Sequence, residues 1–236
     1  MAILELKNID KRFPGVKALN NVTLSIDRGE IRGLIGPNGS GKTTLIRTII
    51  GFYKPDKGEI IYNGNKMGDD EVWIRVNKGL SLTSQDPLYV SGLSIFRHIE
   101  LGMISKNLSE NIVEKKIMEI ATEVGLEGEL NEDPSELPIL SAKKLEIAKA
   151  LSTDPKLIMI DEIFAGLSFE EGEQMVSILK RQNKEKELTI LLIDHNLRMV
   201  KKMVEKTTVI DLGEIIAEGS FEEIIEDEKV RMAYVG

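Results

Sequence analysis

GPNGSGKT occupies residues 36–43 and fits the pattern G-x-x-x-x-G-K-[ST]. It follows an apolar stretch, residues 30–35, that is predicted to be a strand, and it opens a helical stretch, residues 42–50, that stops before Gly51. Glycines let successive backbone N–H groups converge at a helix N-terminus, where they attract an anion. We therefore expect a phosphate-binding loop made of Gly36, Pro37, Asn38, Gly39, Ser40, Gly41, Lys42, Thr43 and Thr44.

Within this loop, Lys42 is expected to bridge the outer phosphates, and the Thr43 hydroxyl is expected to ligate Mg²⁺. A phosphate loop alone does not separate kinases, GTPases and transport motors, so a second acidic element is needed. LIMIDE, residues 157–162, supplies it. Asp161 ends a buried apolar strand, where a carboxylate is costly unless it faces a cation, and Glu162 can deprotonate an attacking water.

Guanine selectivity is not expected. A GTPase would need an N-K-x-D motif. The Asn-Lys pairs at Asn77 and Asn183 continue as Gly-Leu and Glu-Lys, and the pair at Asn65 continues as Met-Gly.

Composition limits the possible classes of protein. The chain has 236 residues, a net charge of -8, 42% hydrophobic residues, no Cys and only two His, His98 and His195. These values are typical of a globular protein and argue against a metal enzyme with several His or Cys ligands. No apolar run approaches the roughly 18 residues of a membrane span, so a soluble cytoplasmic chain is expected. The acidic balance argues against broad nucleic-acid binding.

The order of apolar patterns predicts an α/β fold. Alternating residues at 3–9 and 22–26 predict an antiparallel strand layer, and 58–64 a hairpin strand. Apolar strands at 79–84, 156–161 and 188–194, separated by helical patterns, predict a parallel sheet covered on both faces. Two further strands flank the Leu212-Gly213 turn, and an acidic helix follows from Phe221. We expect one domain, residues 1–236, with a helical subdomain inserted at about 87–150.

Together these motifs resemble the ATP-binding-cassette (ABC) ATPases across essentially the whole chain. Phe13 in KRFPG matches the aromatic residue that stacks on adenine, and Gln85 in TSQDP matches the Gln that reaches Mg²⁺ and the attacking water. His195 in LLIDHN matches the switch His that contacts the γ-phosphate and holds the general base. The resemblance implies that Thr43, Gln85 and Asp161 organise Mg²⁺ and that Glu162, His195, Gln85 and Lys42 are catalytic.

Finer features are similar to the ATPase subunits of branched-chain amino acid importers, and the lipopolysaccharide-export ATPase is similar in the same places. These features are GLIGPNGSGKTTL, the FAGLS after the acidic pair, the helix HNLRMV and the ending IAEGSFEEIIEDEKVRMAYVG.

The family's L-S-G-G-Q signature is degraded here. Counting back from KLEIAKAL, residues 144–151, puts Leu137, Pro138, Ile139, Leu140 and Ser141 on its five positions. Starting the signature at Leu140 instead would need a two-residue deletion. In the family this peptide faces the ATP of a second subunit across a head-to-tail dimer, and either register lacks both glycines and the Gln. Ile163 in place of Pro, and Ser168 in place of an interface Asp, are smaller departures.

The resemblance implies an ATP-hydrolysing motor subunit, with ATP and Mg²⁺ as cofactors, held on the inner face of the cell membrane by separate transmembrane permease subunits. These would dock near Gln85 and the DPLYVSGLSIF that follows it. A second ABC ATPase subunit is the other expected partner, as a heterodimer, with a homodimer possible. The alternatives are a regulatory or asymmetric-partner subunit with little hydrolysis of its own, a lipopolysaccharide-export-type ATPase, and a soluble cassette protein of DNA repair or translation. The last lacks support because the chain has no tandem second cassette, no long coiled coil and no strong positive charge.

Overall fold

The computed structural model describes residues 1–83 and 89–235. Within these residues an antiparallel sheet has the strand order β2-β1-β4-β5. Its members are β1 (Ala2–Phe13), β2 (Val16–Asp27), β4 (Lys57–Tyr62) and β5 (Asn65–Lys66). Tight turns join β1 to β2 and β4 to β5, and Gly15 and Gly64 in these turns have positive φ.

The second sheet carries the site. Among the described residues its order is β10-β9-β3-β8-β7-β6, parallel except for the β10–β9 pair. Its members are β3 (Ile31–Ile35), β6 (Leu80–Leu82), β7 (Leu157–Asp161), β8 (Thr189–Ile193), β9 (Lys206–Asp211) and β10 (Glu214–Gly219). Since β3, β8 and β7 are adjacent and parallel, the loops at their carboxyl ends meet at one edge of the sheet.

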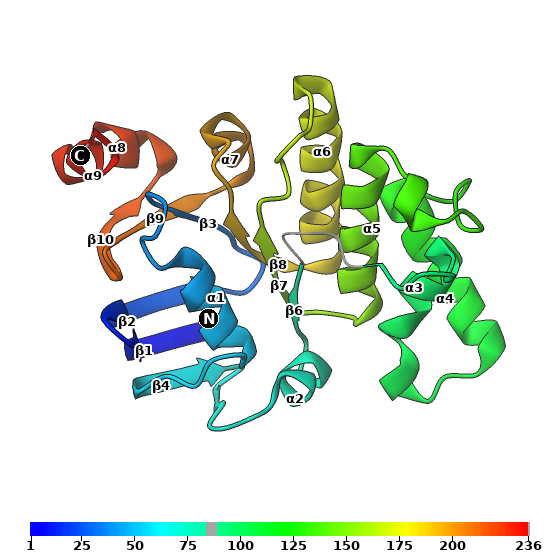
Figure 1. Cartoon of the computed structure of the whole chain (residues 1–236), viewed down its shortest axis with the longest axis horizontal. Helices are drawn as coiled ribbons and strands as arrows, with labels where there is room; N and C mark the ends of the chain where they lie inside the picture. The colour runs from blue at the N-terminus through cyan, green and yellow to red at the C-terminus, as the bar shows by residue number, and fades with distance from the viewer. Residues whose placement is uncertain (84–88, 236) are drawn as a thin grey trace.

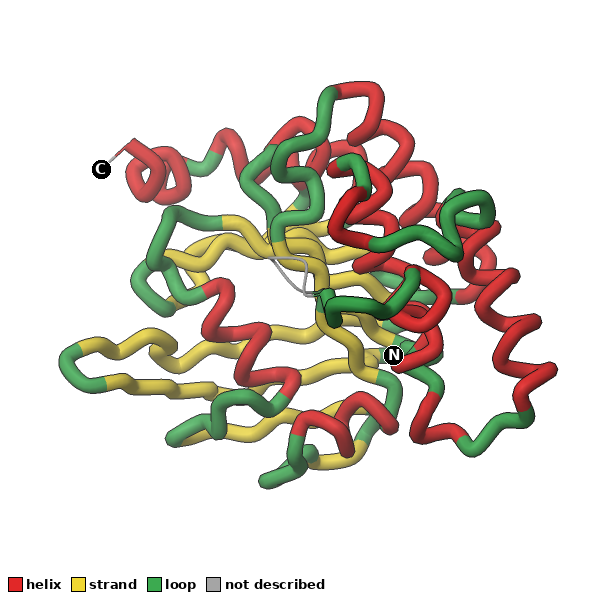
Figure 2. The backbone as a smooth tube through the Cα atoms, turned by 45° about the vertical axis from the view of Figure 1, so that its right-hand side comes forward, coloured by secondary structure: helices red, strands yellow, loops and turns green. Residues whose placement is uncertain are grey.

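Helices cover this sheet and form a separate group at one side. Facing the core are α1 (Lys42–Ile50), α2 (Val72–Asn77), α6 (Phe169–Lys186), α7 (Leu197–Met203), α8 (Phe221–Glu226) and α9 (Glu228–Val235). The side group comprises α3 (Ile95–Leu101), η1 (Ile104–Lys106), α4 (Glu110–Val124), η2 (Pro134–Glu136) and α5 (Ile139–Ser152). Figure 1 shows α3, α4 and α5 together on the side away from β1, β2 and β4. Figure 2 shows the strands at the centre and left of the molecule, with most helices above and to the right of them.

Two hydrophobic clusters use opposite faces of the larger sheet. In β7, Ile158 and Ile160 pack into the cluster shared with the helical side group, whereas Leu157 and Met159 pack into the cluster around α1 and the antiparallel sheet. All five β7 residues are therefore buried. This explains why the parallel strands appear in the sequence as unbroken apolar runs.

The predicted α/β cassette fold is confirmed, with its antiparallel layer, parallel core and helical group. The predicted turn at Leu212-Gly213 joins β9 to β10. The first two strands are longer than predicted, because β1 and β2 continue past the alternating stretches to pair as far as Phe13 and Val16. Ser84, the end of the predicted strand at 79–84, lies outside the described residues, and β6 covers Leu80–Leu82.

Candidate functional site

A cavity of about 580 Å³ opens where the carboxyl ends of β3 and β7 meet the tip of the β1–β2 hairpin. Its walls include residues from the predicted phosphate loop, the acidic pair, the adenine-stacking position and the switch position. They are Phe13, Val16, Lys17, Ala18, Asn38, Gly39, Ser40, Gly41, Lys42, Thr43, Thr44, Asp161, Glu162, His195, Leu212 and Gly213. The fold thus brings together residues that are up to 200 positions apart.

The shape of the phosphate loop depends on glycines that touch the antiparallel sheet. Gly41 has φ +110, and a Cβ there would lie 2.6 Å from the Ala18 carbonyl oxygen. Gly213 has φ +80, and its Cβ would lie 2.7 Å from the same oxygen. The Gly213 amide also donates to the Ser40 carbonyl at 2.8 Å. The β9–β10 turn and β2 therefore fix the loop from behind, which leaves its front open to the cavity.

Lys42 begins α1 and turns its ammonium back over the loop. Its Nζ donates to the carbonyl oxygens of Gly36 and Pro37, each at 2.8 Å, and the residue is buried. Burial lowers the pKa of Lys42, and the nearby carboxylates of Asp161 and Glu162 partly oppose this. Neutral carbonyls are weak partners for a buried cation, so a phosphate anion in the cavity would be a stronger one.

Asp161 ends β7 and faces the first turn of α1. Its Oδ2 accepts from the Thr43 hydroxyl at 3.5 Å, and its own amide donates to Thr83 Oγ1 at 3.2 Å. Burial, reinforced by the charge of Glu162, raises the pKa of Asp161. A bound divalent cation would relieve this penalty. Mg²⁺ needs only one or two protein oxygens when phosphates and waters complete its shell, so this hydroxyl–carboxylate pair fits it.

Glu162 follows the strand in a left-handed conformation, with φ +53, which is sparse for a non-glycine residue. Its amide donates to the Ile193 carbonyl of β8 at 2.8 Å. The side chain turns toward the neighbouring loop, where Glu162 Oε1 lies 3.4 Å from His195 Nε2. Glu162, the expected general base, and His195, the expected switch residue, thus lie together at the ends of two adjacent strands.

Phe13 lies at the mouth of the same cavity with about a third of its surface exposed. Its ring meets the ring of Tyr53 edge-on, with 5.1 Å between centroids. Lys11 Nζ also lies over the Phe13 ring, 5.6 Å from its centroid, and the exposed part of the ring borders the cavity. Gln85 lies outside the described residues.

Two buried polar residues that contact the segment around Glu162 and His195 were not predicted. Asp194 follows β8, and its carboxylate accepts from the amides of Phe164, at 2.9 Å, and Asn196, at 2.8 Å. It therefore joins the segment after Glu162 to the segment that carries His195. The argument applied to Asp161, a carboxylate at the end of an apolar strand, would have found it. Lys143 on α5, discussed below, had no such signal.

The degraded signature lies at the start of α5. Pro138 occupies the N-cap position, and Ala142 makes the first helical hydrogen bond, to the Pro138 carbonyl. Ser141 is already inside the helix, buried, with its hydroxyl donating to Glu129 at 3.2 Å. This placement favours the ungapped register, in which proline replaces the serine that would cap the helix.

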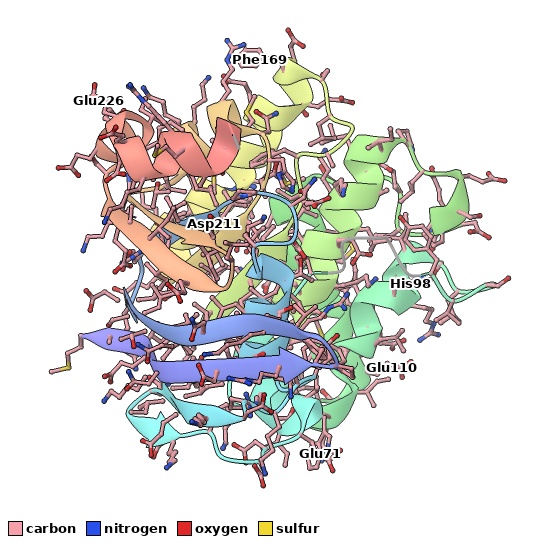
Figure 3. The ribbon with its side chains drawn as sticks, turned by 60° about the vertical axis from the view of Figure 1, so that its left-hand side comes forward. Glu71, His98, Glu110, Phe169, Asp211 and Glu226 are labelled. Atoms are coloured by element: carbon pink, nitrogen blue, oxygen red, sulfur yellow. The ribbon has the colours of Figure 1, made fainter. Side chains whose placement is uncertain are left out.

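The two smaller departures have local explanations. Ile163 is fully buried in the core. Ser168 caps α6 in a reciprocal capping box with Glu171, just before Phe169 at the outer edge of the molecule (Figure 3).

Comparison with known proteins gives concordant results. A family model described as ABC transporter matches residues 19–165. The methionine import ATP-binding protein MetN of Lactobacillus acidophilus is 34% identical over 95% of this chain and 67% of its own length. The corresponding protein of Haemophilus ducreyi is 33% identical over 98% of this chain and 69% of its own length, and that of Rhizobium meliloti 33% over 89% and 61%. The chain thus spans about two thirds of the length of these relatives.

Solved structures resemble the whole chain. A nucleotide-free ATP-binding cassette from an ABC transporter superposes with a TM-score of 0.92 at 30% identity, covering 100% of both chains. A dimeric cassette in a post-hydrolysis state, bound to ADP and Pi, gives 0.84 at 26% identity, covering 92% of this chain and 98% of its own.

Proposed function

Because this chain belongs to the ABC transporter family and is an ATPase that uses ATP and Mg²⁺, we propose that it is the motor subunit of an amino acid importer. One observation carries the assignment of hydrolysis. Asp161 and Glu162 follow a buried strand and line the same cavity as the phosphate loop, with His195 3.4 Å from Glu162. That arrangement supplies phosphate binding, a metal site and a general base in one place.

The residues divide the reaction between them. The loop amides and Lys42 would hold the phosphates, Thr43 and Asp161 would hold Mg²⁺, and Phe13 would stack on adenine. Glu162 would take a proton from a water as that water attacks the γ-phosphorus, while the bond to the β–γ bridging oxygen breaks and ADP leaves. His195 would keep the Glu162 carboxylate oriented. When bound, Mg²⁺ neutralises charge on the phosphate oxygens.

Amino acid import is the substrate class we propose. The sequence features are similar to branched-chain amino acid importers, whereas the relatives described above are methionine importers at 33–34% identity. Both groups import amino acids, so the class is supported more broadly than either substrate. The choice between branched-chain amino acids and methionine depends on the permease and binding protein.

We propose that permease subunits dock in a groove beside the nucleotide cavity. A cavity of about 640 Å³ lies between α1, α2 and α5, lined by apolar side chains that include Phe52, Tyr53 and Val72 and by the charged pair Glu146 and Lys149. Among the described residues no helix is long and apolar enough to cross a membrane. We propose that permease subunits bind this groove and hold the chain at the inner face of the membrane, with residues 1–236 as one ATP-binding domain and about 87–150 as its helical subdomain.

A second, different cassette is the proposed partner of this chain. The phosphate loop of this chain is intact. The start of its helix α5, however, presents Pro138, which has no amide hydrogen, and an exposed Ile139. Two copies would form two half-built composite sites. A partner with an intact signature would complete the site at this chain's phosphate loop. This asymmetry also supports the alternative of a subunit that binds ATP and hydrolyses little of it alone.

The test of the motor assignment uses Lys42→Ala and Glu162→Gln. Nucleotide binding is measured by calorimetry and hydrolysis by phosphate release. We expect Lys42→Ala to lose most MgATP affinity, and Glu162→Gln to keep that affinity while losing hydrolysis.

Lys54→Ala is the matched control. Lys54 is exposed, and its only ion pair within the described residues is with the carboxylate of Asp69, which is also exposed. Equal ATP binding by wild type and Lys42→Ala would overturn the phosphate-loop assignment. Wild-type turnover in Glu162→Gln would overturn the general base.

A further inference from the structure

Lys143 connects the helical side group to the segment that begins at Glu162, called the catalytic segment below. It lies in the second turn of α5 and is buried, and its Nζ donates to the backbone carbonyl of Glu162 at 3.0 Å. A buried ammonium is costly without a partner, so this bond has to be maintained while α5 stays against the segment. The cation therefore ties α5 to the residue proposed as the general base.

The Glu162 backbone is held from both sides. Its amide is fixed by Ile193 of β8, and its carbonyl is fixed by Lys143. These two bonds span a residue with φ +53, a conformation that persists in a non-glycine residue only when its surroundings enforce it. The direction of the carboxylate follows from this backbone conformation.

The start of α5 touches the same segment a second time. A Cβ built on Gly166 would lie 3.5 Å from Cγ2 of Ile139, so the first residue of α5 lies against the stretch that follows Glu162. Elsewhere α5 packs mainly against α3 and α4, with fewer contacts to β6. A shift of α5 with its neighbours would carry Lys143 away from the Glu162 carbonyl.

We propose that Lys143 is a positioning residue that holds Glu162 in its hydrolysis-competent conformation and so couples the placement of α5 to the general base. The proposal rests on the proposed role of Glu162. Lys143 itself does not lie among the residues that line the nucleotide cavity. Its loss should therefore change turnover rather than nucleotide affinity.

The perturbation is Lys143→Met, which keeps an unbranched side chain as far as the ε carbon and removes the ammonium donor. We expect kcat for ATP hydrolysis to fall about tenfold or more, as for the loss of one hydrogen bond from a charged group, with the Kd for MgATP nearly unchanged. Lys143→Arg, which keeps a cationic donor, should restore most of the rate. Lys143→Gln, whose nitrogen stops one bond short of the carbonyl, should show the same loss if Lys143→Met does not fold.

Lys144→Met is the matched control. Lys144 is the next residue on the same helix and also donates to a backbone carbonyl, that of Gly125 at 3.3 Å, which lies outside the catalytic segment. It should keep the wild-type kcat. An equal loss of kcat in Lys144→Met, or wild-type kcat in a folded Lys143→Met, would overturn the proposal, as would a parallel loss of MgATP affinity.

A double variant separates this proposal from the proposed role of Glu162 as the general base. If Lys143 acts through Glu162, adding Lys143→Met to Glu162→Gln should lower the residual rate no further. A further loss would show that Lys143 acts by another route. If Glu162→Gln alone hydrolyses ATP like wild type, the general-base assignment fails, whatever Lys143→Met does.

Discussion

Restoring the signature peptide should allow two copies of this chain to form an ATP-dependent dimer. The variant is Pro138→Ser with Ile139→Gly, which returns a hydroxyl to the N-cap of α5 and a glycine to its first turn. Leu140 is kept, because it packs against the hydrophobic core. Glu162→Gln is added to every protein compared, so that ATP is not consumed.

The magnitude follows from the contacts regained. A serine N-cap stabilises a helix by about 1 kcal/mol, and glycine near the helix start costs up to about the same, so the stability of the monomer should change little. Ile139 is 55% exposed, so its truncation removes little packing. Each hydrogen bond regained to a γ-phosphate is worth about 1.5–3 kcal/mol. A two-fold dimer contains two such sites, so its Kd should fall by roughly 100-fold or more.

Sedimentation velocity with and without MgATP measures the effect. The unrestored chain should stay mainly monomeric, and the restored chain should dimerise only when ATP is present. Pro138→Ala with Ile139→Gly controls for removal of the proline ring, since it adds no hydroxyl, and it should dimerise less. Tight ATP-dependent dimerisation of the unrestored chain, unchanged by the restoration, would refute the reasoning and favour a homodimeric motor.

Two further changes probe the site. Phe13→Ala should weaken MgATP binding by roughly 5- to 150-fold through loss of ring stacking, and it should leave tripolyphosphate binding unchanged in calorimetry. An equal loss of affinity for both ligands would contradict the assignment of Phe13 to adenine stacking. Asp161→Asn should raise the melting temperature of the nucleotide-free protein at pH 7. Burial raises the folded pKa of Asp161, so its contribution to stability is present below the unfolded value of 3.8 and is lost as the pH rises through the folded value. The gap between variant and wild type should therefore be smaller at pH 4.5 than at pH 7, and a gap of constant size would contradict the burial argument.

The phosphate loop and the acidic pair could be predicted because their signals are local. Residues 36–43 carry glycines at fixed spacing between a strand and a helix, and Asp161 ends an apolar run whose short length favours a buried strand. Adjacent parallel strands then bring both to one edge of the sheet. The same reasoning extends to Asp194, at the end of β8.

Tertiary structure alone decided how these residues are held. The Gly213 amide supports Ser40, the Ala18 carbonyl passes against Gly41, and Lys143 reaches the Glu162 carbonyl. In each case one partner is a backbone group, which every residue type provides, so no pattern of side chains marks the pair. The start of α5 at Ile139, after Pro138, likewise favours the ungapped register of the signature peptide, between two registers that the sequence allows. Local patterns specify strands, helices and anion-binding loops because those depend on neighbours in sequence, whereas contacts between distant backbone and side-chain atoms exist only after the sheets and helices have packed.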